Sequence, residues 1–171
     1  MLCVVGMPGC GKSIFLTAAS ELGYCIVSMG DAVREETEKR GLPPDRHGEI
    51  ARILREEQGL AAVAYLVVER ITPDCIIDGI RGMPEIEVFL QKYPVEIVAI
   101  HASPSTRFCR VQKRKRPGDP FSWDEFTERD ARELKFGIGN VFALADYMLV
   151  NESTIEDFMK VCQTFLERRF Q

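Results

Sequence analysis

Short apolar runs alternate with longer amphipathic stretches along the chain. Five apolar runs predict strands that are buried on both faces: Leu2–Val5, Tyr24–Val27, Cys75–Ile77, Val95–Ile100 and Tyr147–Val150. Apolar residues at helical spacing predict helices over Lys12–Leu22, Ala32–Arg40, Glu49–Ile71, Ile86–Tyr93, Ser105–Arg114, Trp123–Phe136 and Thr154–Phe170. This alternation predicts an α/β fold, a doubly wound five-stranded parallel sheet with helices on both faces.

Local signals refine the helix assignment. Gly59 interrupts the long stretch Glu49–Ile71, which predicts a division into two helices because glycine weakens a helix interior. Capping-box spacing, in which an N-cap hydroxyl precedes a glutamate by three positions, indicates where two further helices start. These boxes are Ser122 with Glu125 and Ser153 with Glu156.

Composition narrows the class of protein. The 171 residues predict a single domain over 1–171, and a net charge of −4 argues against a protein that coats nucleic acid. The longest apolar run, Leu60–Val68, is far shorter than the ~20 residues that span a bilayer, and no signal peptide is evident. Six cysteines without a C-x-x-C pair disfavour a zinc knuckle or redox dithiol. We therefore expect a cytoplasmic protein with buried thiols, a monomer or small homo-oligomer without membrane or stable nucleic-acid partners.

Residues 6–13, GMPGCGKS, fit the phosphate-loop pattern G-x-x-x-x-G-K-[ST] between a predicted strand and a predicted helix. Glycines let successive backbone N–H groups face one phosphate, and the helix N-terminus adds partial positive charge. Lys12 is expected to neutralise the β- and γ-phosphates of ATP, and the Ser13 hydroxyl to bind Mg²⁺. The expected nucleotide-binding residues of this segment are Gly6, Met7, Pro8, Gly9, Cys10, Gly11, Lys12, Ser13 and Ile14.

Cys10 is an uncommon residue for such a loop, and two interpretations stand side by side. A thiol near a helix N-terminus and Lys12 would have a lowered pKa, so alkylation of Cys10 would block nucleotide binding. Alternatively, Cys10 is an inert small side chain.

Two further segments follow predicted strands and carry charged residues. In SMGDAVR, residues 28–34, Asp31 can cap the next helix, and Arg34 lies one turn further on. In IIDGIR, residues 76–81, Asp78 ends the third strand at the carboxyl edge of the sheet. There it could orient Mg²⁺, its waters or an acceptor hydroxyl, and Arg81 lies close to the same edge.

The order of phosphate loop, SMGDAVR and IIDGIR resembles the nucleoside monophosphate kinase fold, adenylate kinases in particular. The resemblance implies that Arg34 and Arg81 grip the acceptor phosphate within a helical acceptor-binding insert at about residues 31–72. One residue separates Gly79 from Arg81, where adenylate kinases have two. Glu85 stands near the place of their adenine-reading glutamine. It could recognise a base edge rich in hydrogen-bond donors, or it could simply be a carboxylate in the first turn of a helix.

A basic region follows the fourth predicted strand. Arg107, Arg110 and Arg114 fall on one helix face, and the segment 113–121, KRKRPGDPF, reads as an exposed, mobile excursion. Such arginines could stabilise transferring phosphate charge, or form a solvated face or a patch for an anionic polymer. The kinase resemblance implies a short lid over 113–121, with catalytic arginines at Arg110, Arg114, Arg129 and Arg132.

Residues 145–151, ADYMLVN, resemble the last strand of dephospho-coenzyme A kinases, which implies that Asn151 borders the adenine of the donor. The whole chain is similar to an archaeal family of small P-loop kinases related to both groups. The leading interpretation is an Mg-ATP-dependent kinase that phosphorylates a nucleoside monophosphate or related nucleotide. The alternatives are a dephospho-coenzyme A kinase-like activity and, in another class, an NTP-hydrolysing switch or assembly factor.

Overall fold

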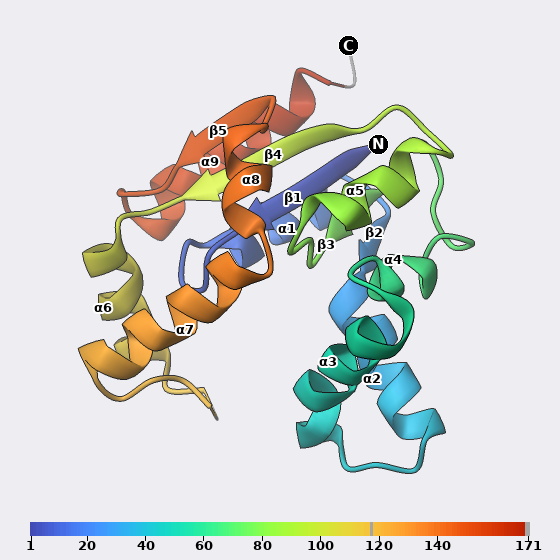
Figure 1. Ribbon diagram of the computed structural model, residues 1–171. Coiled ribbons are helices and arrows are strands. Elements are labelled where there is room, and N and C mark those ends of the chain that lie inside the picture. Colours follow the sequence, from blue (N-terminus) through green and yellow to red (C-terminus); the bar gives the residue numbers. More distant parts are fainter. Residues whose placement is uncertain (117, 170–171) are drawn as a thin grey trace.

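The computed structural model describes residues 1–116 and 118–169. In this part of the chain, five parallel strands form one sheet in the order β2-β3-β1-β4-β5 (Figure 1). The strands are β1 (Leu2–Gly6), β2 (Ile26–Ser28), β3 (Ile76–Asp78), β4 (Glu96–His101) and β5 (Tyr147–Val150). The predicted α/β fold and its five strands are confirmed, with ends that differ by no more than two residues.

The described helices are α1 (Lys12–Glu21), α2 (Met29–Lys39), α3 (His47–Gln58), α4 (Ala62–Tyr65), α5 (Met83–Leu90), α6 (Pro104–Arg114), α7 (Trp123–Lys135), α8 (Ile138–Ala143) and α9 (Ile155–Glu167), with a 3₁₀ turn at Pro44–Arg46. Gly59 ends α3 with a φ of 91°, so the division at this glycine is confirmed. Helix α8 was not predicted. The predicted end of the last helix, Phe170, lies outside the described residues.

Hydroxyl caps start both helices for which the sequence indicated a capping box. Ser122 accepts a hydrogen bond from the Glu125 N–H, which confirms that start. Helix α9 begins one residue later than the spacing indicated, because the Thr154 hydroxyl, and not Ser153, accepts from the Asp157 N–H. Among the described residues, none of the helices has the length and apolar character that a membrane crossing requires.

The sheet separates two apolar clusters. Successive side chains of β1 point to opposite faces of the sheet, so Cys3 and Val5 belong to one cluster and Leu2 and Val4 to the other. Helices α5 and α8 cover the first face, and α1 and α9 pack together on the second (Figure 1). This burial explains why the central strands are apolar at consecutive positions.

Strand β5 departs from the expectation of burial on both faces. It lies at the edge of the sheet and pairs only with β4 among the described strands. Tyr147, Met148 and Val150 are consequently exposed despite their apolar character.

Two groups of helices extend beyond the carboxyl ends of the strands (Figure 1). Helices α2, α3 and α4 leave the sheet after β2 and return before β3; they occupy most of the predicted insert, residues 31–72. Helices α6 and α7 leave after β4 and flank the predicted lid, residues 113–121. The loop between β1 and α1 lies between these two groups in the view of Figure 1.

Candidate functional site

The phosphate loop joins β1 to α1 through a tightly packed turn. Gly9 and Gly11 have φ values of 85° and 96°, which favour glycine. A Cβ on Gly9 would lie 2.8 Å from the Arg107 carbonyl oxygen, and one on Gly11 would lie 2.1 Å from Asn151 Nδ2. Glycine is therefore required at both positions by backbone conformation and by close neighbours.

Asn151 holds the loop from the end of β5. Its side chain is buried, and Nδ2 donates to the Cys10 carbonyl oxygen at 2.8 Å. Its Oδ1 accepts from Arg110 Nη2 at 3.1 Å. The resemblance placed Asn151 beside the donor adenine, whereas in the structure its amide is engaged with the loop backbone and with Arg110.

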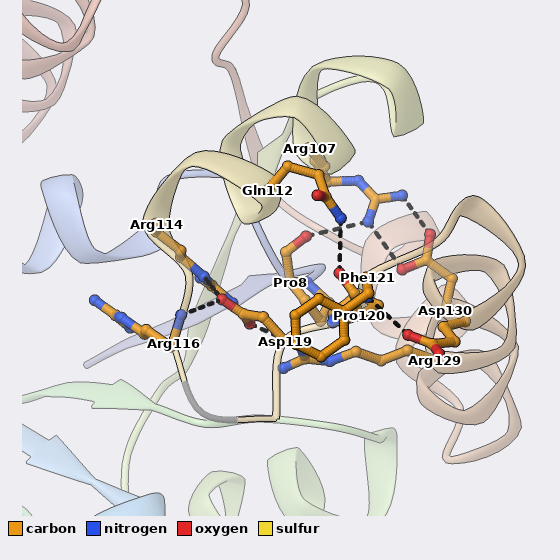
Figure 2. Close-up of polar contacts among 11 residues, drawn as sticks. Pro8, Arg107, Gln112, Arg114, Arg116, Asp119, Pro120, Phe121, Arg129 and Asp130 are labelled. Atoms are coloured by element: carbon orange, nitrogen blue, oxygen red, sulfur yellow. Dashed lines mark hydrogen bonds and ion pairs between the residues drawn. The ribbon is translucent and has the colours of Figure 1, made fainter.

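Arg107 holds the same loop from α6. Its Nη1 donates to the Pro8 carbonyl oxygen at 3.2 Å, and its guanidinium forms two hydrogen bonds to Asp130 of α7, at 2.9 and 2.5 Å (Figure 2). The guanidinium also lies 4.9 Å from the centre of the Phe126 ring. Arg107 is buried and was not among the predicted site residues. The sequence signal that could have identified it is its position on the same helix face as Arg110 and Arg114.

Lys12 and Asp78 form an ion pair that joins the start of α1 to the end of β3. Both side chains are partly exposed, and Ser13 follows Lys12 with an exposed position. The Ser13 hydroxyl and Asp78 carboxylate are hard oxygen donors, which suit Mg²⁺ when phosphates and waters complete the shell. Within residues 1–116 and 118–169 there is no cluster of three or more His, Cys, Asp or Glu that could hold a metal alone.

The start of α2 lies against the residue that follows Asp78. A Cβ on Gly79 would lie 3.5 Å from the Gly30 N atom, and one on Gly30 would lie 3.8 Å from Arg34 Nη1. Arg34 belongs to this same helix, which starts directly after Ser28, the register partner of Asp78. Asp31 pairs with Arg34 and does not cap α2; that cap is Ser28, whose hydroxyl accepts from the Asp31 N–H at 3.1 Å.

Arg81 and Glu85 belong to a network that the sequence did not predict. Arg81 forms an ion pair with Glu133 of α7. Glu85 is only 1% exposed and accepts from the Arg81 N–H at 2.7 Å and from Arg55 Nη2 at 2.9 Å. Both guanidiniums lie within 6 Å of the Phe136 ring centre, at 5.4 Å for Arg55 and 5.8 Å for Arg81. Assigning Glu85 to base readout is thus corrected, because its carboxylate is buried and already paired.

The predicted lid is anchored at Asp119 (Figure 2). Arg114 donates twice to the Asp119 carboxylate, at 2.8 and 2.7 Å, and Arg129 Nη1 donates at 3.2 Å. The Arg114 guanidinium, above all, lowers the pKa of Asp119 to about 2. The expectation of an exposed, mobile segment is corrected at Asp119 and Pro120, which are buried, while Phe121 is 88% exposed. Pro117 lies outside the described residues, and Arg132 is exposed on α7.

The structure gives Cys10 a raised pKa, contrary to the reactive-thiol hypothesis. The residue is buried, and the loss of solvation raises the pKa of its thiol. A hydrogen bond from the Lys12 backbone and the charges of Lys12, Arg107 and Arg110 lower it, but by less. The inert interpretation of Cys10 is therefore the one that fits.

Asn151→Ala should weaken both the fold and nucleotide binding. The change removes the 2.8 Å hydrogen bond to the Cys10 carbonyl and the 3.1 Å bond from Arg110, leaving that carbonyl only the longer 3.5 Å contact with Arg110, which costs about 1–3 kcal/mol of unfolding free energy. A less ordered loop should bind a fluorescent ATP analogue several-fold more weakly. Urea unfolding and nucleotide titration would measure the two effects. Asn140→Ala, at an exposed position of α8, should change neither, and equal behaviour of the two variants would contradict the prediction.

Asp119→Asn should lower the melting temperature in a pH-dependent way. Because the folded-state pKa of about 2 lies below the ordinary 3.8, ionised Asp119 stabilises the fold above pH 3.8. This contribution is lost as the pH falls toward 2. The difference in melting temperature between wild type and variant should therefore be constant near neutral pH and shrink as the pH falls from 3.8 to about 2. Thermal scans across pH test this, with Asp45→Asn as the exposed control; a gap that persists at pH 2 would refute it.

Comparison with known proteins places the chain in a family. Residues 5–126 match the model of a family described as AAA domain. A UPF0200 protein from Hyperthermus butylicus is 46% identical over 174 residues, covering 98% of this chain and 94% of that protein.

Solved structures share the fold at low sequence identity. A dephospho-CoA kinase from Campylobacter jejuni has a TM-score of 0.63 at 15% identity, over 97% of this chain and 94% of that one. A shikimate kinase from Bacteroides thetaiotaomicron has a TM-score of 0.60 at 17% identity, over 97% of each chain. The predicted P-loop kinase fold is thereby confirmed. The AAA domain model matches residues 5–126, and the archaeal relative matches almost the full length of the chain. The chain therefore belongs to the UPF0200 family of P-loop proteins.

Proposed function

We propose that this protein is an Mg-ATP-dependent kinase that transfers the γ-phosphoryl group to a nucleoside monophosphate or a related nucleotide. The observation that carries this proposal is the ion pair between Lys12 of the phosphate loop and Asp78 at the end of β3. Gly79, next in sequence, lies against the start of α2, the helix that carries Arg34. A donor-phosphate lysine and a carboxylate thus meet at the sheet edge from which the helix with the acceptor-side arginine starts.

This arrangement suits phosphoryl transfer, which depends on positioning and charge stabilisation more than on covalent chemistry. The loop N–H groups and the N-terminus of α1 would bind the ATP phosphates, with Lys12 neutralising their charge. Asp78 would orient the acceptor hydroxyl toward the γ-phosphate. Mg²⁺ would be held by Ser13 and Asp78 together with the phosphates, and it supplies neutralisation of phosphate charge.

The lid arginines would supply additional positive charge. Arg110 lies beside the loop, where it contacts Asn151, and Arg114 and Arg129 are gathered on Asp119 from both sides of the lid. In the proposed closed state, these guanidiniums would face the transferring phosphate and exclude water. Arg132, exposed on α7, would join them.

An anionic acceptor is favoured by the exposure of the acceptor-side arginines. The side chains of Arg34 and Arg81 are 48% and 40% exposed, and each is paired with one carboxylate, Asp31 or Glu133. Because a surface ion pair contributes little net free energy, a phosphate dianion with bidentate geometry can replace the carboxylate. A monophosphate is therefore a better candidate than a neutral alcohol.

A second candidate acceptor is dephospho-coenzyme A. The likeness to the Campylobacter jejuni enzyme supports the fold it requires, and the shortened Asp78-Gly79-Ile80-Arg81 segment departs from the adenylate kinase pattern. Glu85 is occupied by Arg55, so the structure provides no base-reading carboxylate at that position.

A coupled ADP-release assay would test the proposal. Mg-ATP is mixed with AMP, CMP, UMP, GMP, dTMP or dephospho-coenzyme A, and one sample has no acceptor. Stimulation by one mononucleotide is expected, and Lys12→Ala should lower that rate by about 10²-fold or more because a phosphate-neutralising charge is lost. Lys160→Ala, at an exposed position of α9, should retain the wild-type rate.

The other outcomes of the assay discriminate between functions. Stimulation by dephospho-coenzyme A alone would move the activity to that acceptor. Equal ADP release in all samples, including the one without acceptor, would favour the NTP-hydrolysing switch or assembly factor. Ordinary turnover by folded Lys12→Ala would remove the role assigned to the phosphate loop.

Arg81→Ala should affect acceptor use more than ATP use. Loss of a charged hydrogen-bonding group should raise the acceptor KM by about tenfold or more, while slow ADP release without acceptor stays unchanged. Arg70→Ala is the matched control, since Arg70 is also about half exposed and paired with a glutamate, Glu35, on the insert. An acceptor KM that is the same in both variants would refute the role of Arg81.

A further inference from the structure

Two cysteines lie side by side at the amino ends of β2 and β3. Cys25 and Cys75 immediately precede Ile26 and Ile76, which are register partners, and the Ile76 N–H donates to the Cys25 carbonyl oxygen at 2.8 Å. Neighbouring strands lie about 4.7–4.9 Å apart, within the Cα separations of about 4.4–6.8 Å that disulfides span. The two Sγ atoms are 2.8 Å apart.

The two thiols differ in their access to solvent. Cys25 is exposed, contrary to the expectation of buried thiols, whereas Cys75 is fully buried. The Cys75 sulfur also lies 3.4 Å from the Thr72 N atom and 3.1 Å from the Thr72 hydroxyl. An external reagent therefore reaches Cys25 first, and the Cys75 thiol lies next to it, within reach of a sulfur bound to Cys25.

We propose that Cys25 and Cys75 form a reversible disulfide by exchange with a small-molecule disulfide. The Cys25 thiolate attacks one sulfur of the reagent, a mixed disulfide forms, and one thiolate leaves. The Cys75 thiolate then attacks Cys25 Sγ, the Cys25–Cys75 bond forms, and the second thiolate leaves. Two electrons pass from the cysteines to the reagent, and the two cysteine protons end on the two released thiols.

This bond would join the strands from which the acceptor-side helices emerge. The loop that it closes, residues 25–75, contains α2, α3 and α4. A crosslink across a loop of this length restricts the unfolded chain, so the melting temperature should rise by roughly 5–15 °C. The pair lies at the opposite ends of β2 and β3 from Ser28 and Asp78, so the inference does not rest on the proposed kinase activity.

The rate of exchange should depend on pH. The pKa of Cys25 is raised to about 11. The hydrogen bond with the Cys75 thiol is the largest cause, and partial loss of solvation is the second. Its thiolate is therefore scarce at neutral pH, and crosslinking should accelerate as the pH is raised toward that value.

The experiment treats the full chain with oxidised glutathione at mildly alkaline pH, blocks the remaining thiols by alkylation and maps the peptides by mass spectrometry. Two of the six free thiols should be lost, with a peptide crosslinked between Cys25 and Cys75. The melting temperature should rise, and dithiothreitol should reverse both changes.

Two variants make the result specific. Cys25→Ser should show neither the crosslink nor the thermal shift, while Cys109→Ser, which removes the other exposed cysteine, should show both. Six remaining thiols, a glutathione adduct on Cys25 that Cys75 does not resolve, or dimers linked through Cys25 would each overturn the proposal. A crosslink without a higher melting temperature would overturn its stabilising role.

Discussion

The site depends on the fixed orientation of the peptide groups in the phosphate loop. The Pro8 carbonyl accepts from Arg107, and the Cys10 carbonyl accepts from Asn151. In a planar trans peptide, the C=O and the following N–H point in opposite directions. Binding these two carbonyls therefore directs the N–H groups of Gly9 and Gly11 away from α6 and Asn151. The side chains behind the loop thus set the direction in which its donors point.

Burial distinguishes the arginines that build the site from those that can bind a ligand. Arg107 is buried and the Arg55 side chain is only 9% exposed, and each is paired with a carboxylate from a distant part of the chain, Asp130 or Glu85. Removing one partner of such a pair strands a buried charge, so these pairs fix the structure. Arg34 and Arg81 are much more exposed, and exchanging a carboxylate for a phosphate costs them little desolvation.

Local patterns predicted most of the fold, and long-range contacts account for what they missed. The strands, the phosphate loop and the break at Gly59 were predictable because each depends on residues close in sequence. The role of Asn151 was not, because its partner Cys10 lies 141 positions away. The two interpretations of Cys10 could not be separated for a related reason: nearby charges can be read from the sequence, but the burial that raises the pKa of its thiol is produced by the folded chain.

The relative positions of the donor and acceptor sides depend on two very short strands. Strands β2 and β3 have three residues each, and their register places Ser28, which caps α2, opposite Asp78. A shift of one residue would turn each side chain to the other face and move Arg34 relative to Asp78. Burial of Val27 and Ile77 in the same apolar cluster opposes that shift. The geometry between Lys12, Asp78 and Arg34 is therefore determined by core packing beneath the site as much as by the charged residues themselves.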